Sequence, residues 1–167
     1  SYINEELEEQ FNLLIGTIRT IRNLRAEAEI KPSAKVKAIL QSDSDRERNL
    51  LEAGQSYILD LARVEDLAVV ASVDASATEQ AIAGVVGTIQ VIVSLVGVVD
   101  IGQLVAKLER TLTKLEGLIA STQGRLNNEG YIKKAPPEVV ATARAELEES
   151  LKQQEILKAR LAQLQGK

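Results

Sequence analysis

Two groups of basic side chains are the features of this sequence whose chemistry suits the binding of a polyanion. Residues 19–37 contain six basic and two acidic side chains, and residues 101–134 contain six basic and three acidic ones. Lys and Arg bind phosphate through charge-assisted hydrogen bonds, so either group could follow the backbone of a nucleic acid. The alternative in both places is a solvated helix face whose charges contribute little beyond solubility.

The spacing within each group places its charges on one side of a helix. Three arginines of the first group recur at every third position, and three basic residues of the second group follow an i, i+3, i+7 pattern. Three further basic residues of the second group lie within or beside a sequence that breaks the helix. The charges concerned are Arg19, Arg22 and Arg25 in the first group, and Lys107, Arg110, Lys114, Arg125, Lys133 and Lys134 in the second.

The sequence lacks the side chains on which catalysis and metal binding usually depend. Its 167 residues include no His and no Cys, which removes the commonest general base and every thiolate nucleophile or ligand. It has no Gly-rich phosphate-binding loop, and the acidic run at 43–47 lacks the central Gly and distal Glu of a calcium loop. We therefore expect no catalytic residues, no cofactor and no metal site in this chain.

The first basic group lies on a helix that we expect over residues 5–29. Apolar residues recur there at spacings of three and four, as in an amphipathic helix, and Pro32 follows to end it. Residues 35–40 and 66–72 have the apolar, alternating character of strands. Good N-cap residues precede a helical pattern between these two stretches, so the sequence predicts a small α/β segment.

Residues 81–99 are uncharged, and this stretch has two possible interpretations. A transmembrane helix needs about 20 such residues. The stretch contains seven Val, three Ile and three Gly, which favour strands over a helix. Gly87 and Thr88 provide a turn in its middle, and its flanks lack the Lys and Arg that accompany membrane spans. We therefore favour a buried β-hairpin.

The second basic group lies on the first of two helices that we expect within residues 100–167. Narrow apolar stripes run on both sides of the break "NNEGYIKKAPPEVV" at residues 127–140. Two helices of similar length joined by a short connection pack as an antiparallel coiled-coil hairpin. An arm of about 26 residues extends about 40 Å, and we expect it to project because the sequence offers it no third helix.

The predicted fold class is mainly α with a minor β part. Residues 1–33 form a helical segment, residues 34–99 a small α/β connector with a β-hairpin, and residues 100–167 the antiparallel coiled coil. The first residues are acidic and polar where a signal peptide would be basic and apolar. We therefore expect a cytoplasmic protein.

Two strings carry a resemblance to a known family. "TIRTIRNLRAEAEIKP" at residues 17–32 resembles the closing helix of the anticodon-binding domain in class I aminoacyl-tRNA synthetases for branched aliphatic amino acids. Residues 93–140 resemble the junction, outgoing helix and tip of the C-terminal coiled coil of valyl-tRNA synthetases, and "LNNEGYIKKAPPEVV" is the most specific part. The resemblance follows the same order along essentially the whole chain. Residues 81–99 are most similar to a bacterial form of this family, and in particular to a cyanobacterial one.

The resemblance implies that this chain is the C-terminal part of a valine-tRNA ligase. That family attaches valine to tRNA(Val) through valyl-adenylate, using ATP and magnesium, and hydrolyses mischarged threonyl-tRNA in a separate editing domain. Its His-rich and Lys-Ser-rich nucleotide-binding signatures do not occur in this chain. ATP and magnesium would therefore belong to the parent enzyme, and the expected partners of this non-catalytic part are tRNA(Val) and the rest of the synthetase chain, within a monomer.

The resemblance also implies roles for individual residues. The first basic group would lie in the anticodon region, and the arm would reach the outer corner of tRNA, where the D and T loops meet. Tyr131 would offer its ring to an exposed base pair or ribose, or pack with Ile132 at the tip. The tRNA-binding residues expected on this basis are Arg19, Arg22, Arg25, Lys107, Arg110, Lys114, Arg125, Tyr131, Lys133 and Lys134.

Two other functions are compatible with the same sequence. The arm could dock a protein, or a second subunit, without binding nucleic acid. Residues 81–99 could instead tether the chain to a membrane if they formed a helix.

Overall fold

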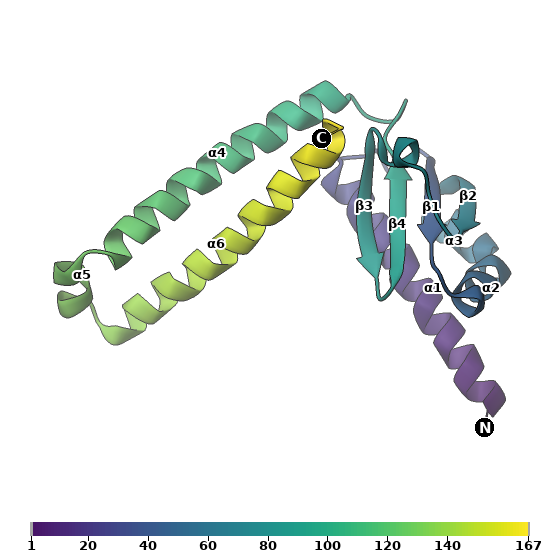
Figure 1. Ribbon diagram of the computed structural model, residues 1–167, viewed down its shortest axis with the longest axis horizontal. Coiled ribbons are helices and arrows are strands. Elements are labelled where there is room, and N and C mark those ends of the chain that lie inside the picture. Colours follow the sequence, from purple (N-terminus) through teal and green to yellow (C-terminus); the bar gives the residue numbers. More distant parts are fainter. Residues whose placement is uncertain (1, 167) are drawn as a thin grey trace. The chain divides into compact units, whose positions relative to one another are not determined.

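The computed structural model describes residues 2–166 and divides them into two compact units (Figure 1). The first unit comprises the chain up to Ile101 together with the last residues from Gln163, and the second comprises Gly102–Ala162. The sequence predicts a boundary between residues 1–33 and 34–99. Both stretches lie within the first unit, because the first helix packs on the sheet.

Helix α1 spans Tyr2–Glu27 and covers one face of the sheet with its second half. Leu14, Ile18, Ile21 and Leu24 form its buried stripe, as the spacing predicts. The helix ends before Pro32, because Glu29 adopts a left-handed conformation with φ of 57°. The amide of Glu29 donates to the carbonyl of Ala26, a capping arrangement that closes the last turn.

A four-stranded mixed sheet forms the centre of the first unit. Its order is β2-β1-β4-β3, with β1 parallel to β2 and antiparallel to β4. The parallel pair is connected through helices, as a parallel pair requires, whereas β3 and β4 form a hairpin. The strands are β1 (Val36–Gln41), β2 (Val64–Val70), β3 (Ala81–Val86) and β4 (Ile89–Ser94).

The hairpin predicted within residues 81–99 is confirmed. Its turn is at Gly87 and Thr88, and Gly87 has a φ of 58°, which Gly adopts without steric cost. The strand β4 is buried along most of its length. Among the described residues, no helix combines the length and the apolar character needed to cross a membrane.

The helical pattern between β1 and β2 forms two helices where the sequence indicates one. Helix α2 spans Asp45–Ala53 and α3 spans Gln55–Leu61, with Gly54 between them. Ser44 is the N-cap of α2, and its hydroxyl accepts a hydrogen bond from the amide of Glu47 at 3.2 Å. A Cβ at Gly54 would lie 2.4 Å from the side chain of Leu14, so this side chain would have to shift if a larger residue replaced Gly54. A short 3₁₀ helix, η1 (Ala75–Thr78), follows β2.

The second unit is an arm built from two long antiparallel helices and a short one. Helix α4 (Ile101–Leu126) and helix α6 (Pro137–Leu164) lie side by side, with α5 (Glu129–Lys134) where the chain reverses (Figure 1). The sequence predicts only a turn at this place. Asn128 explains the difference, because its side chain caps α5 by accepting a hydrogen bond from the amide of Tyr131 at 3.3 Å.

The seam between α4 and α6 is narrow. The buried side chains within Gly102–Ala162 are Leu104, Ile119, Thr122, Leu126, Ala143 and Leu161. Thr122 is the polar member, and its hydroxyl donates to the carbonyl of Leu118 one turn earlier at 2.9 Å. The seam therefore contains no buried side-chain polar atom without a partner among the described residues.

Candidate functional site

Four basic side chains of α4 share one face of the helix. At about 100° per residue, Lys107, Arg110, Lys114 and Arg125 fall within an arc of about 60°. All four side chains are exposed. We call this surface the basic face. The helix therefore presents four cations in a row along about 27 Å of its length, at about 1.5 Å per residue.

The acidic residues of α4 do not interrupt the basic face. They are Glu109 and Glu116, which project about 120° or more from the centre of that arc. The partner helix α6 has a different balance, with four basic and five acidic residues, and its Lys152 pairs with Glu148 at 3.6 Å. Of the two long helices, only α4 therefore has a net positive charge, which can act on a phosphate backbone.

The tip of the arm adds two exposed cations to this surface. Lys133 and Lys134 occupy the last turn of α5, where positive charge also compensates the helix dipole. Tyr131 in the same helix is half-buried, and Ile132 is exposed. Both roles of the Tyr131 ring remain predictions. A half-buried ring can pack against the protein on one face and leave its other face accessible to a ligand.

Arg125 occupies the end of the basic face nearest the tip. Its guanidinium approaches the hydroxyl of Thr122 at 3.4 Å, a long contact that uses one of its five N–H groups. Its exposed position leaves the guanidinium accessible from solvent. A bidentate contact with a phosphate is compatible with this geometry.

The arginines of the first basic group are divided by burial. Arg19 and Arg22 are exposed, whereas Arg25 retains only 7% of its accessible surface. The Arg25 guanidinium donates to three carbonyl oxygens, those of Ala34 at 2.7 Å, Lys31 at 3.0 Å and Arg63 at 3.3 Å. Burial lowers the pKa of Arg25, and the nearby charge of Arg63 lowers it further.

Arg25 therefore holds the connection between α1 and β1 to the start of β2. This role is structural, whereas its three-residue spacing from Arg22 predicts that Arg25 binds a polyanion together with Arg22. A signal for it exists in the sequence, because Arg25 falls within the arc of Leu14, Ile18 and Ile21, all of which are buried. A charged residue within an apolar stripe indicates a buried, fully hydrogen-bonded group.

The described residues contain no group of acidic side chains arranged to hold a metal ion. The interaction that the basic face can make with a phosphate is electrostatic and needs no proton transfer. Aromatic residues make up 2% of the sequence, so stacking on successive bases has few candidate side chains. The arrangement suits recognition of a phosphate backbone by position and charge.

Comparisons with known proteins place the second unit in a described family. Residues 100–165 match a family model described as "Valyl tRNA synthetase tRNA binding arm". The match begins beside the start of α4 and ends just beyond the end of α6. It therefore includes the basic face, the tip and both sides of the seam.

The whole chain is similar to part of several valine–tRNA ligases. It is 49% identical over 164 residues to that of a Synechocystis strain, covering 98% of this chain and 18% of the relative. The valine–tRNA ligase of a Nostoc strain is 38% identical, over 97% of this chain and 25% of the relative. That of Thermosynechococcus vestitus is 45% identical, over 87% of this chain and 16% of the relative. The chain thus spans about a fifth of the length of these curated relatives.

Proposed function

The chain belongs to the valyl-tRNA synthetase family, and we propose on this basis that its second unit is a tRNA-binding arm without catalytic activity of its own. The basic face of α4 supports this proposal most directly. Four exposed cations follow one side of a long helix that has no acid within the same arc. Such a row attracts a phosphate backbone whatever its base sequence.

The parent enzyme would supply the chemistry. In this proposal it attaches valine to tRNA(Val) with ATP and magnesium and removes mischarged threonine, and the present chain corresponds to its C-terminal region. The arm would act by holding the tRNA, which positions the reacting end elsewhere on the same molecule. The enzyme would work in the cytoplasm as a monomer.

Individual contacts follow from exposure and charge. Lys107, Arg110 and Lys114 would bind consecutive phosphates at the outer corner of the tRNA, and Arg125 would extend the row. Lys133, Lys134 and one side of the Tyr131 ring would contact the tRNA from the tip. Two helices of about 40 Å have a length that suits the reach from an enzyme body to that corner.

The anticodon region would be served by the first unit. Arg19 and Arg22 are exposed and available to a phosphate or base there. Arg25 would act indirectly, because its three carbonyl contacts occupy its guanidinium within the chain. We therefore assign it a positioning role in this region.

Charge removal on the basic face tests the proposal. The change is the triple substitution Lys107→Gln, Arg110→Gln and Lys114→Gln in the complete ligase. Binding of tRNA(Val) is measured as a dissociation constant at several salt concentrations between 50 and 200 mM. Loss of three phosphate contacts should weaken binding about tenfold or more and reduce the slope of log K against log salt by about 2–3.

A matched control removes the same net charge from the other long helix. Arg144→Gln, Lys152→Gln and Lys158→Gln are all on α6, away from the basic face. These changes should alter affinity far less than the α4 triple. Wild-type tRNA affinity after the triple substitution in α4 would contradict the proposal. Equal losses of affinity after both triple substitutions would mean that tRNA responds to the net charge of the arm and not to the basic face.

A second candidate function is a protein-docking arm, which its exposed apolar side chains favour. Leu118 and Ile156 are 54% and 58% exposed, and Val139 is 45% exposed. A docking arm would keep its tRNA affinity after the α4 triple. It would lose a protein partner after Leu118→Gln or Ile156→Gln, measured by co-purification with the complete ligase.

A further inference from the structure

The connection between α1 and β1 contains a tight turn with a basic residue on either side. The amide of Ala34 donates to the carbonyl of Lys31 at 2.9 Å and closes this turn. Pro32 occupies the second position, where its fixed φ is favourable. Lys31 begins the turn and Lys35 follows it, and both side chains are exposed. The backbone of the turn is therefore fixed, while its two cations are accessible from solvent.

The buried guanidinium of Arg25 brings a third exposed cation to this turn. It donates to the carbonyls of Lys31, Ala34 and Arg63, so the turn and the residue before β2 meet at one side chain. The amide of Val36 also donates to the carbonyl of Arg63, at 3.0 Å, and strengthens the same junction. Three exposed basic side chains surround this junction, and we call them the junction cations: Lys31, Lys35 and Arg63.

Arg63 adopts a backbone conformation that is unfavourable for its residue type. Its φ is 53°, in the left-handed region that Gly adopts without steric cost. Such conformations cost free energy, and they cluster at functional sites. Among residues 2–166, the Arg63 guanidinium makes no hydrogen bond or ion pair that would account for an Arg at this position. Its exposed side chain is therefore available to a ligand.

The junction has an excess of positive charge. Residues 25–37 and 63–65 together contain five basic and three acidic side chains. Burial lowers the pKa of Arg25, and the nearby charge of Arg63 lowers it further, because the two arginines repel each other. Lys31 and Lys35, like Arg63, form no ion pair within the part of the chain that the structure describes. A bound anion would offset this repulsion.

We propose that the junction cations form a second phosphate-binding site, which takes the sugar-phosphate backbone of the tRNA on the first unit. Lys31 and Lys35 supply ammonium groups, and Arg63 supplies a guanidinium that can hold two oxygens of one phosphate. Arg25 is the positioning residue beneath them. Because all three cations are exposed, the surface suits a polyanion with several phosphates better than one small enclosed anion. The inference rests on the proposed function, since it takes tRNA as the ligand.

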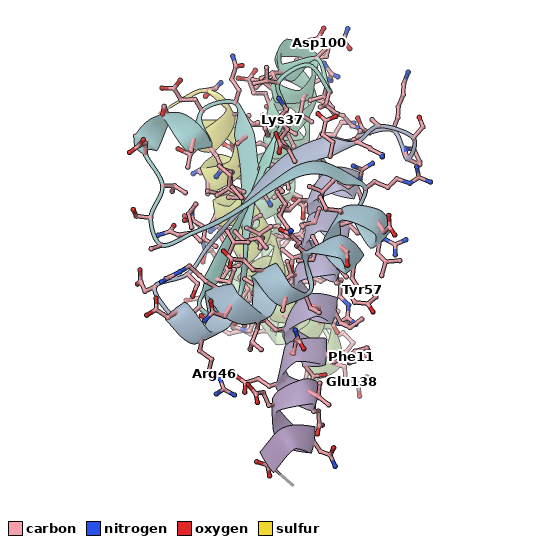
Figure 2. The ribbon with its side chains drawn as sticks, turned by 90° about the vertical axis from the view of Figure 1, so that its right-hand side faces the viewer. Phe11, Lys37, Arg46, Tyr57, Asp100 and Glu138 are labelled. Carbon is pink, nitrogen blue, oxygen red and sulfur yellow. The ribbon has the colours of Figure 1, made fainter. Side chains whose placement is uncertain are left out.

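Charge removal at Arg63 in the complete ligase tests the proposal. Arg63→Gln should weaken binding of tRNA(Val) about threefold to tenfold and reduce the slope of log K against log salt by about 1. Arg46→Gln is the matched control, because it removes one exposed arginine charge from the same unit. Figure 2 shows Arg46 well away from Lys37, which lies two positions after Lys35. Equal losses of affinity after both substitutions would overturn the proposal.

Stability separates a ligand-binding role of Arg63 from a structural one. Arg63→Gly removes the charge and also the unfavourable backbone conformation, so the 167-residue chain should melt about 2–4 °C higher. The same substitution in the complete ligase should weaken tRNA binding as Arg63→Gln does. Arg63→Lys keeps the charge and should recover most of the affinity. A lower melting temperature with unchanged tRNA affinity for Arg63→Gly would show that Arg63 is structural and would overturn the proposal.

A small anion at the junction would give a different result. Inorganic phosphate, added at constant ionic strength, would then compete with tRNA for the wild-type ligase but not for Arg63→Gln, and this outcome also overturns the proposal. The triple substitution in α4 is a separate measurement. If it weakens tRNA binding while Arg63→Gln does not, only the junction proposal fails. If neither substitution changes the affinity, the tRNA-binding proposal fails as well.

Discussion

The two units of this protein differ in how deeply their side chains are buried. The twelve largest side chains with less than 2% exposure all lie in the first unit, and they include Leu40 on β1 and Ile92 on β4. The best-buried side chains of the arm within residues 102–162 are Thr122 at 3% and Ala143 at 5%, both small. A sheet covered by helices encloses side chains from several directions, whereas two helices share one seam with solvent on both sides.

The two units also differ in net charge. Within the full sequence, residues 102–162 contain ten basic and eight acidic side chains, and the remaining residues contain ten basic and sixteen acidic ones. The arm is therefore net positive by two and the rest net negative by six. A long positive rod and a compact acidic body are suited to different tasks, the rod to reach a polyanion and the body to fold around an apolar core. Substitutions in each unit test this difference.

The largest effect is expected in the core of the first unit. Leu40→Ala removes a side chain with no exposed surface from the centre of β1 and leaves a cavity. The free energy of unfolding should fall by about 2–5 kcal/mol. Urea denaturation followed by circular dichroism measures it, with Val85→Ala on the exposed side of β3 as the control, for which a change within about 0.5 kcal/mol is expected. A loss below about 1 kcal/mol for Leu40→Ala would show that the core is not the main source of stability.

Removal of the buried arginine should have the next largest effect. Arg25→Gln leaves the carbonyls of Lys31, Ala34 and Arg63 without their shared donor, which should cost about 2–3 kcal/mol. Arg22→Gln, on the same helix but exposed, should change stability by less than about 0.5 kcal/mol. Thermal or urea unfolding of the two variants side by side measures the difference. Equal stabilities would remove the structural role assigned to Arg25.

A seam substitution in the arm should cost less than the core substitution. Ile119→Ala removes a side chain that is 6% exposed, and the loss of local stability should be about 2 kcal/mol, at the lower end for buried aliphatic residues. Amide exchange of α4 peptides reports it as faster opening of the arm. Leu118→Ala is the control from the adjacent position, since Leu118 is 54% exposed. Faster exchange after both changes would mean that the seam lies elsewhere on α4.

Glycine substitutions should give the smallest effects, with opposite signs in the two units. A Cβ at Gly117 or Gly124 of α4 meets no atom within 4 Å, so Gly→Ala should stabilise the arm by about 0.5–1 kcal/mol at each position. Gly54→Ala should instead destabilise the first unit, because its Cβ would lie 2.4 Å from Leu14. Melting temperatures of the three variants test the contrast. A lower melting temperature for Gly117→Ala would indicate a contact that the arm makes at this position.

Most of the fold follows from local patterns. Three-four spacing predicts α1, α4 and α6 because a helix needs only one apolar stripe to pack, and the Val-rich stretch with Gly87 in its middle predicts the hairpin. The break between α2 and α3 was not predicted. Gly54 lies at the break, and the side chain of Leu14, from a distant part of the sequence, lies close to it, which no local pattern records.

The candidate site was predicted in part. The basic face follows from spacing alone, because residues on one side of a helix are set by 100° per residue. Spacing does not show which of the exposed charges contacts a ligand. It also placed Arg25 in one binding group with Arg19 and Arg22. An apolar groove beside Phe11 and Tyr57 also escaped prediction, since it combines residues from two helices that are distant in the sequence.

The sequence by itself determined the three long helices, the hairpin and the charge pattern of α4, because each depends on neighbours within one or two turns. Only the tertiary structure decided that Arg25 is buried on three carbonyl oxygens and that Asn128 starts a short helix at the tip. It also decided that Leu7 and Phe11 face an open groove, although both follow the same apolar pattern as the buried Leu14. Burial depends on what packs above a side chain, and that is a property of the folded chain rather than of its local sequence.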